Sequence, residues 1–381
     1  MELTDYRNEI DAIDKELVDL FVKRMNACAG VAEYKKEHGL PVLDASRERA
    51  LLSKVSELSG EDFEDYTRTL YSTILTLSRS YQHSKLGTNS KLYDEITKSL
   101  ETTPKMFPER ATVACQGIEG AYSQIAAERL FKAPDIIFFS NWEKVFSAIE
   151  AGLCKYAVIP IENSTAGSVK KVYDLMISHR FHIVRTVRVK IDHCLLAKNG
   201  TKLSDIKEIY SHDQAISQCS AFLSTLGENV KITRVENTAE AAAMVASSER
   251  HDVASISSRS CALQYGLSVI SSSIQDNTNN HTRFICIGKD VEIYPGADRT
   301  TLMLVTPHKP GALFKILSRF NALGINLLKL ESRPIPDRDF EFMFYFDLES
   351  SVYSPKLANL LSELEQECDE FTYLGSYSEV I

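Results

Sequence analysis

Residues 156–168 read YAVIPIENSTAGS, an apolar run that ends in a cluster of polar residues. The apolar run is typical of a buried strand, and the polar cluster follows directly at its carboxyl end. On either side of this stretch, short apolar strands alternate with helical segments from Ala111 to Gly288. The alternation predicts an α/β fold, in which ligands bind outside the carboxyl ends of the strands. The polar cluster is therefore a candidate binding site.

The chain has 381 residues, of which 44% are apolar and 25% charged, so two or three average globular domains are expected. The formal net charge of −9 gives no basic excess, which argues against a nucleic-acid-binding protein. No apolar run has membrane-spanning length and the first residues are acidic, so we expect no membrane segment, no secretory signal and a cytoplasmic location. The eight scattered cysteines and the histidine pattern predict reduced thiols and no metal site.

The chain divides into three regions with different residue patterns. The first has a helical period, the second is the α/β region, and the third has the order strand, helix, strand, strand, helix, strand, which is typical of a ferredoxin-like α+β domain. We expect a helical domain over residues 1–90, a linker over 91–110, the α/β domain over 111–288, a second linker over 289–298 and the ferredoxin-like domain over 299–378.

The first helix is expected from Asp5 to Glu37, and its apolar residues follow one another at steps of three and four. They predict one buried stripe, made of Tyr6, Ile10, Ile13, Leu17, Leu20, Ala27 and Val31. Arg24 falls on this stripe, Lys35 lies eleven residues later on the same face, and Arg7 lies near its edge. A buried cation is costly unless an anion meets it. Three cations in this arrangement favour an anion site, although for any one of them an internal carboxylate or snorkelling is the alternative.

Two further helices add polar groups to the same core. Asp44 is the expected N-cap of the second helix, whose buried stripe includes Glu48. On the third helix, Ser78 and Gln82 border the buried face. A polar edge remains the alternative for these last two residues.

The spacing of Arg7, Arg24, Lys35, Asp44-x-x-Arg47-Glu48 and Ser78-x-x-x-Gln82 resembles the all-helical chorismate mutase family across residues 1–90. The resemblance implies an intertwined dimer, in which the first helix spans both subunits and Arg7 reaches the partner's site. It also implies a role for each residue: Arg7 and Arg24 bind the carboxylates of chorismate, Lys35 and Gln82 donate to the ether oxygen, Glu48 and Asp44 accept the ring hydroxyl, Ser78 positions a carboxylate and Arg47 assists. The rearrangement needs an oriented substrate and placed donors, but no nucleophile or cofactor.

Four polar segments of the middle region lie at strand ends: residues 117–123, 162–168, 210–214 and 276–284. Alone, each is explained by a tight turn or, at His212, by a helix cap. Together with residues 191–195 they resemble prephenate dehydratase, most specifically in the Thr282-Arg283-Phe284 triplet after an Asn-rich loop. Ile118 departs from the pattern, because many relatives have proline there.

This second resemblance implies two lobes around a cleft that converts prephenate to phenylpyruvate. Thr282 is the implied donor to the leaving hydroxyl. The implied substrate-binding residues are Ser123, Asn163, Ser164, Ser211, Arg283 and Phe284. Arg283 points away from Thr282 if the pair is extended, so a structural ion pair is an equal alternative for it.

The third region contains Pro310-Gly311-Ala312-Leu313 and, about twenty residues later, Glu331-Ser332-Arg333-Pro334. Each is explained alone by turn chemistry. Together, in this strand and helix order, they resemble the ACT domain of phenylalanine-regulated dehydratases. The resemblance implies that such domains pair side by side in a homodimer or higher oligomer. Phenylalanine would bind at their interface as a feedback inhibitor.

Two other functions compete with this interpretation. A mutase fused to prephenate dehydrogenase needs G-x-G-x-x-G after a strand, but the loop at Gly117 reads G-I-E-G. A phenylalanine-binding regulator without catalysis is also compatible with a two-lobed fold. The presence of Thr282 and of the mutase cations argues against it.

Overall fold

A computed structural model describes residues 2–86, 90–227, 229–335, 338, 341–368 and 370–380 of the chain. Two compact units are present. The first comprises Met1–Lys98 with Leu302–Tyr373, and the second comprises Ser99–Thr301 with Leu374–Ile381. Each unit is described by itself.

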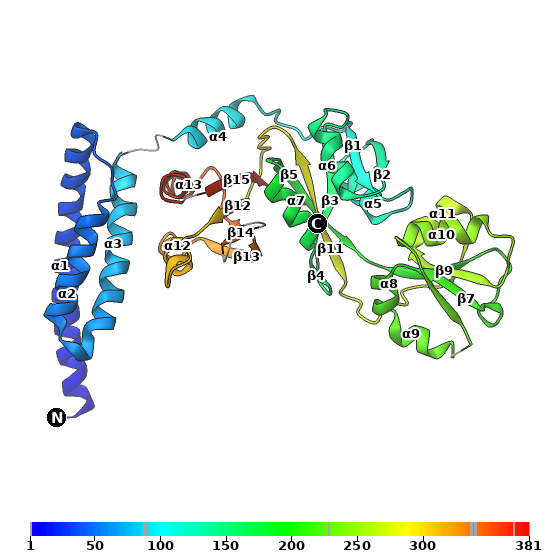
Figure 1. The fold of residues 1–381 in the computed structure, drawn as a ribbon, viewed down its shortest axis with the longest axis horizontal. Helices are drawn as coiled ribbons and strands as arrows, with labels where there is room; N and C mark the ends of the chain where they lie inside the picture. Colours follow the sequence, from blue (N-terminus) through cyan, green and yellow to red (C-terminus); the bar gives the residue numbers. More distant parts are fainter. Residues whose placement is uncertain are drawn as a thin grey trace. The chain divides into compact units, whose positions relative to one another are not determined.

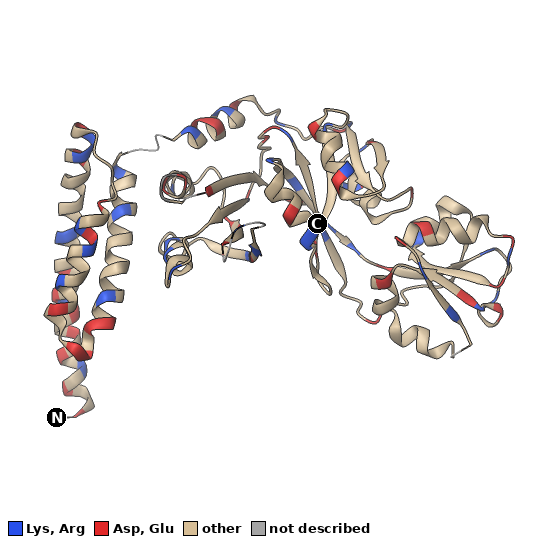
Figure 2. Ribbon diagram, in the orientation of Figure 1, with Lys and Arg blue, Asp and Glu red and all other residues tan. Residues whose placement is uncertain are grey.

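The first unit begins with three long helices, as the sequence predicts (Figure 1). They are α1 (Leu3–His38), α2 (Ala45–Ser59) and α3 (Glu64–Leu86), with a short 3-10 helix η1 (Glu61–Phe63) before α3. Gly39 ends α1 in the left-handed conformation, at φ 64°. The predicted N-cap of α2 is confirmed, because the Asp44 side chain accepts from the Arg47 backbone N–H at 3.0 Å. Both α1 and α2 pack against α3, and Figure 2 shows acidic and basic residues interspersed along all three helices.

The predicted buried stripe of α1 is exposed in the single chain. Tyr6, Ile10, Ile13 and Leu17 are each slightly more than half exposed, and Ala32 is the buried residue of this helix. The N-terminal end of α1 extends beyond α2 and α3 (Figure 1). A helix of 36 residues is too long for the 15-residue α2 and the 23-residue α3 to cover it throughout, so its apolar face remains open.

The expected linker at residues 91–110 is partly helical. Helix α4 (Lys91–Thr102) buries Leu92 and Ile96, which lie one turn apart on the same face. Ser90, just before this helix, accepts a hydrogen bond from Ser362 at 3.2 Å. The linker prediction missed the helical period of residues 91–102.

The second unit contains the two-lobed α/β domain that the sequence predicts. The strand order of the first lobe is β16-β5-β11-β3-β1-β2, with β4 paired to β3. Its strands are β1 (Thr112–Gln116), β2 (Asp135–Phe139), β3 (Tyr156–Asn163), β4 (Gly167–Ser168), β5 (His182–Lys190), β11 (His281–Gly288) and β16 (Glu379–Val380), and its helices are α5 (Tyr122–Leu130), α6 (Trp142–Glu150) and α7 (Lys170–Ser178). Strands β1 and β3 are apolar because helices cover the sheet around them.

The second lobe has the strand order β10-β6-β9-β7-β8. Its elements are β6 (His193–Ala197), η2 (Leu203–Asp205), β7 (Glu208–Ser211), α8 (Asp213–Gln218), α9 (Ser220–Thr225), β8 (Lys231–Arg234), α10 (Thr238–Ser247), β9 (Val253–Ser258), α11 (Arg259–Tyr265) and β10 (Ser268–Ser271). The chain passes between the lobes twice, from β5 to β6 and from β10 to β11 (Figure 1). Catalytic candidates in β11 therefore lie beside one of these two crossings.

The third region has the predicted ferredoxin-like fold. Its elements are β12 (Arg299–Val305), α12 (Ala312–Ala322), β13 (Asn326–Pro334), β14 (Phe342–Glu349), α13 (Pro355–Glu367) and β15 (Glu370–Tyr377). The strand order is β13-β14-β12-β15, which puts the first and third strands in the middle and makes β13 an edge strand.

The chain after β15 forms a strand that the sequence did not predict. Strand β16 pairs in parallel with β5, with Glu379 opposite Thr186. The buried Glu379 carboxylate lies 3.0 Å from Arg188 and 2.9 Å from Arg299. The end of the chain is thus part of the first-lobe sheet.

Candidate active sites

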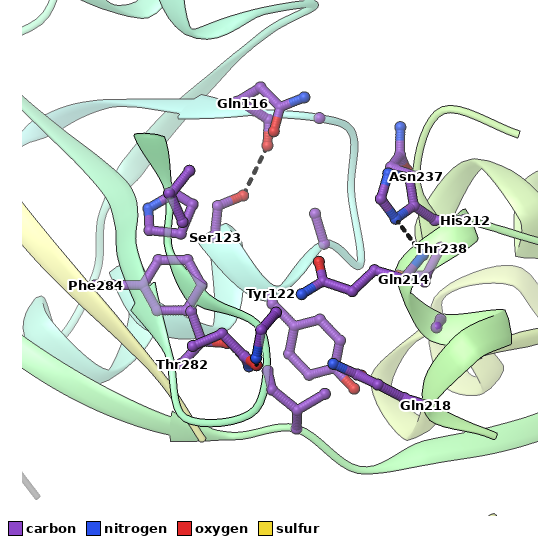
Figure 3. Close-up of a pocket in the computed structure, with 18 of the residues that line it drawn as sticks. Gln116, Tyr122, Ser123, His212, Gln214, Gln218, Asn237, Thr238, Thr282 and Phe284 are labelled. Atoms are coloured by element: carbon purple, nitrogen blue, oxygen red, sulfur yellow. Dashed lines mark hydrogen bonds between the residues drawn. The ribbon is translucent and has the colours of Figure 1, made fainter. Parts of the chain in front are cut away.

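A cavity of about 600 Å³ lies between the two lobes of the second unit (Figure 3). Its walls include residues at the ends of β1, β3 and β11 and at the beginnings of α5, α6, α7 and α10. The size and the position at strand ends are those of a small-molecule site. The polar cluster predicted from residues 156–168 contributes Asn163, Ala166, Gly167 and Ser168 to this wall.

The electrostatic character of the cavity comes from helix ends and neutral side chains. No lysine or arginine is among the described residues that line it, and Glu236 is the one carboxylate among them. Helices α5, α6, α7 and α10 begin at its wall, and the first turn of a helix carries partial positive charge and open N–H groups. The cavity therefore suits an anion held by neutral donors.

Asn163 and Thr282 form the centre of a hydrogen-bond network at this wall. They lie opposite each other on β3 and β11, and Asn163 Nδ2 donates to Thr282 Oγ1 at 2.9 Å. The orientation of the Asn163 amide is fixed, because its Oδ1 accepts from the backbone N–H groups of Thr165 and Ala166 at 3.0 and 2.8 Å. Since Thr282 accepts from Asn163, its own hydroxyl hydrogen is available to a ligand.

Sequence analysis missed Gln218, which extends this network from the second lobe. Gln218 Oε1 accepts from Asn280 Nδ2 at 3.0 Å, and Asn280 Oδ1 accepts from Asn163 at 2.7 Å. His193 Nε2 also lies 3.0 Å from Gln218 Oε1. Burial lowers the pKa of His193 while the bond to Gln218 partly offsets this, so the ring is neutral at pH 7 and Nε2 is its donor.

With its oxygen engaged twice, Gln218 presents its amide hydrogens to the cavity. Gln214 and Gln218 are one turn apart on α8, and both extend into the cavity (Figure 3). This i,i+4 spacing, just after the predicted strand end, is the signal that could have found Gln218. Tyr122, also missed, lines the cavity and donates to the Asp192 carbonyl at 3.0 Å.

The remaining predicted residues of this region divide into two groups. Ser123 and Phe284 line the cavity, and the Ser123 hydroxyl donates to the Gln116 carbonyl at 2.8 Å (Figure 3). Ser164, Ser211 and Arg283 do not line it, which differs from the expectation.

The last three residues have other contacts. Ser164 donates to the Asn279 carbonyl at 3.1 Å, and the fully buried Ser211 donates to the Ile256 carbonyl at 2.9 Å. Arg283 Nε lies 3.9 Å from the Glu162 carboxylate. The ion-pair alternative is therefore the one that the geometry favours for Arg283. His212 is a helix cap, which accepts from the Gln214 N–H.

The helical domain brings several predicted mutase residues together. Arg24 of α1 donates to the buried Ser78 of α3 at 2.5 Å. Gln82 is buried one turn further along α3. Glu48, in the first turn of α2, contacts α3 through Arg79, the residue directly after Ser78.

The four other predicted mutase residues are exposed or make other contacts. Lys35 Nζ donates to the Val42 carbonyl at 2.5 Å. Arg7 and Arg47 are exposed, Arg7 near the start of α1 and Arg47 in the first turn of α2. The Asp44 carboxylate accepts a hydrogen bond as the N-cap of α2.

The predicted effector residues lie on α12 and β13. Gly311, at φ 79°, is the N-cap of α12, followed by Ala312 and Leu313. Pro310 directly precedes this cap. Residues Glu331, Ser332, Arg333 and Pro334 end the edge strand β13, with Ser332 and Pro334 exposed.

Two protein families match separate parts of the chain. Residues 6–83 match chorismate mutase type II, and residues 113–292 match prephenate dehydratase. A bifunctional chorismate mutase/prephenate dehydratase of Enterobacter agglomerans is 31% identical over 379 residues, which cover 97% of this chain and 94% of that protein. The chain belongs to this bifunctional family.

Two dehydratases are also similar to this chain. Arogenate dehydratase 2 of Petunia hybrida is 38% identical over 285 residues, which cover 70% of this chain and 72% of that protein. The crystal structure of prephenate dehydratase in complex with L-Phe from Arthrobacter aurescens superposes with a TM-score of 0.65 at 29% identity. The matched region covers 70% of this chain and 90% of the chain in that structure.

Within the described residues, no helix is both long and apolar enough to cross a membrane. The same residues contain no group of three or more His, Cys, Asp or Glu side chains that could hold a metal ion. All eight cysteines are free thiols, six of them buried.

Proposed function

We propose that this member of the family rearranges chorismate to prephenate in its helical domain and converts prephenate to phenylpyruvate in the cavity between the lobes. The observation that carries the second activity is the hydrogen bond from Asn163 to Thr282, which frees the Thr282 hydroxyl hydrogen for a substrate oxygen. The free cysteines suit a reducing compartment, and we propose the cytoplasm.

In the proposed dehydration, the bond between the ring and its carboxylate breaks and its electron pair completes the aromatic ring. The ring hydroxyl leaves with a proton as water, and carbon dioxide is released. Thr282 donates a hydrogen bond to the leaving oxygen, which stabilises the charge that develops there. A threonine hydroxyl is a weak acid, so solvent supplies the proton.

The lack of Lys and Arg among the lining residues favours the loss of carbon dioxide. A cation beside the ring carboxylate would stabilise the substrate more than the transition state, in which that charge moves into the ring, and would slow the reaction. Helix N-termini and the Gln218 amide bind the dianion with weaker, distributed donors.

For the mutase, we propose the roles implied by the sequence: Arg24 and Arg7 bind the carboxylates, Lys35 and Gln82 donate to the ether oxygen, Glu48 accepts the ring hydroxyl with Asp44, and Ser78 and Arg47 assist. The hydrogen bond from Arg24 to Ser78 and the burial of Gln82 on the same helix support these roles. The open apolar face of α1 supports a dimer in which Arg7 of one chain completes the site of the other.

We also propose that phenylalanine inhibits the enzyme by binding at Gly311–Leu313 and Glu331–Pro334. The relative from Arthrobacter aurescens is described in complex with L-Phe. Since β13 is an edge strand, two such domains can pair side by side, which places these segments at an interface in a homodimer or larger oligomer.

A second candidate substrate of the cavity is arogenate, which carries an ammonium group where prephenate has a keto oxygen. The resemblance to an arogenate dehydratase of Petunia hybrida favours it. So does Glu236, because a carboxylate at the wall attracts an ammonium and repels a dianion.

The test supplies purified protein with chorismate and follows chorismate, prephenate and phenylpyruvate with and without phenylalanine. Phenylpyruvate that forms without added cofactor and is suppressed by phenylalanine supports the proposal. Prephenate that accumulates unchanged contradicts the dehydratase assignment, and unconsumed chorismate contradicts the mutase assignment. Parallel assays with arogenate as the only substrate test the second candidate.

A further inference from the structure

Arg79 is a buried cation that the predicted mutase residues do not include. It lies on α3 directly after Ser78 and is 6% exposed. Its Nη1 lies 2.5 and 2.7 Å from the two carboxylate oxygens of Glu48 on α2. Its Nη2 donates to Thr76 Oγ1 at 3.2 Å, and Thr76 in turn donates to the Ser72 carbonyl. The guanidinium is thus held by a residue of its own helix, α3, and it binds Glu48 on α2.

Successive residues of α3 therefore fix two oppositely charged groups. Ser78 accepts from Arg24 on α1, and Arg79 binds Glu48 on α2. The Glu48 side chain is 23% exposed, so it still has access to a ligand, whereas the Arg79 side chain is 8% exposed. This difference places Arg79 behind Glu48.

A carboxylate in this cluster needs such a restraint. A free Glu48 side chain would be attracted to the cations of the proposed substrate site, and an ion pair there would occupy a group that binds a substrate carboxylate. Arginine suits the restraint, since its planar guanidinium can bind both carboxylate oxygens and a hydroxyl at once.

We propose that Arg79 is a positioning residue for the rearrangement of chorismate, which holds Glu48 where it accepts the ring hydroxyl and keeps it from the substrate-binding cations. The inference rests on the proposed mutase function. Arg79 acts through Glu48 and does not touch the substrate.

The experiment measures mutase kcat and KM for Arg79→Met, Arg79→Lys, Glu48→Gln and the double variant Glu48→Gln with Arg79→Met, all in the full chain. Arg49→Met is the matched control, because Arg49 is exposed on α2. We expect Arg79→Met to lower kcat/KM by about 10- to 100-fold, as misplacement of a catalytic group does. Lysine, which keeps the charge but cannot make all three contacts, should restore only part of this loss, and Arg49→Met should have no effect.

The decisive comparison is the double variant. If Arg79 acts through Glu48, adding Arg79→Met to the Glu48→Gln variant should change mutase kcat/KM by less than about twofold. A full additional loss in that background would overturn the inference, as would an Arg79→Met variant with wild-type kinetics or one that only raises KM.

Two measurements on the same preparations separate this inference from other failures. The helical circular-dichroism signal reports whether the helical domain of each variant is folded, and conversion of added prephenate to phenylpyruvate reports the same for the dehydratase domain. Arg79→Lys retains the charge if the methionine variant does not fold. In that case the double variant Glu48→Gln with Arg79→Lys replaces the methionine double variant, and a full additional loss from lysine in the Glu48→Gln background would overturn the inference. A wild-type chain without mutase activity would overturn the proposed function itself.

Discussion

The side-chain amide of Asn163 donates to Thr282 Oγ1 over 2.9 Å, between neighbouring strands of one sheet. Both side chains are almost fully buried. The bond can run in only one direction, because the Asn163 oxygen is already bound by the N–H groups of Thr165 and Ala166. The Thr282 hydroxyl hydrogen is therefore available to a ligand in the cavity that this residue lines.

Replacement of Thr282 by valine should remove dehydratase activity and spare the mutase. Valine has a similar shape but no hydroxyl, and removal of one such donor costs about 10²- to 10³-fold in kcat. The measurement is phenylpyruvate formation from prephenate, with chorismate consumption as the internal control. Serine, which keeps the hydroxyl, should retain more activity than valine, and equal activity of the two variants would contradict the role of the hydroxyl.

Complementation should reveal whether Arg7 acts in the partner's site. Arg7→Ala and Arg24→Ala should each abolish mutase activity and spare the dehydratase. When the two variants are mixed, unfolded and refolded together, a hybrid dimer has one intact site, so about a quarter of wild-type activity should return. The control refolds each variant alone. If the mixture stays inactive while hybrid dimers are present, Arg7 serves its own chain's site.

Glu236→Gln should change the preference between the two candidate substrates. An exposed ion pair contributes up to about 1 kcal/mol, so kcat/KM for arogenate should fall by about two- to fivefold. The same change should raise kcat/KM for prephenate, since it removes a negative charge from the wall. Glu249→Gln, an exposed residue of the same lobe outside the cavity wall, is the control. If the ratio of kcat/KM for arogenate to kcat/KM for prephenate equals that of the wild type, Glu236 does not contribute to substrate selection.

Gly375→Ala should destabilise the junction of the C-terminal strands with the dehydratase sheet. A Cβ at Gly375 would overlap the carbonyl oxygen of Ile183 in β5, and backbone cannot move aside as a flexible side chain can. Such overpacking costs about 1–3 kcal/mol, which a lower thermal midpoint should report. Gly296→Ala provides the control, because Gly296 also has positive φ, at 88°, but open space around it. Equal shifts in both variants would mean that backbone strain alone explains the effect.

Local patterns in the sequence determined the elements and much of the chemistry. The helical period predicted α1 and α2, the capping chemistry identified Asp44, and the strand and helix order predicted the α/β region and the ferredoxin-like domain. The two lobes were implied by the resemblance to prephenate dehydratase. The Thr282 motif was equally readable, because it follows directly from a short stretch of chain. These features depend on neighbours within a few residues, which a sequence displays.

Only the tertiary structure decided which distant groups meet. Gln218 and Asn280 join through one hydrogen bond although 62 residues separate them, and Arg79 reaches Glu48 across 31 residues. Strand β16 pairs with β5, and Ser211 turns into the core, for the same reason. Such contacts arise when helices and strands pack, and packing is fixed by the whole core and not by the local period. The apolar stripe of α1 is exposed in the single chain, and its burial is a part of the proposed dimer.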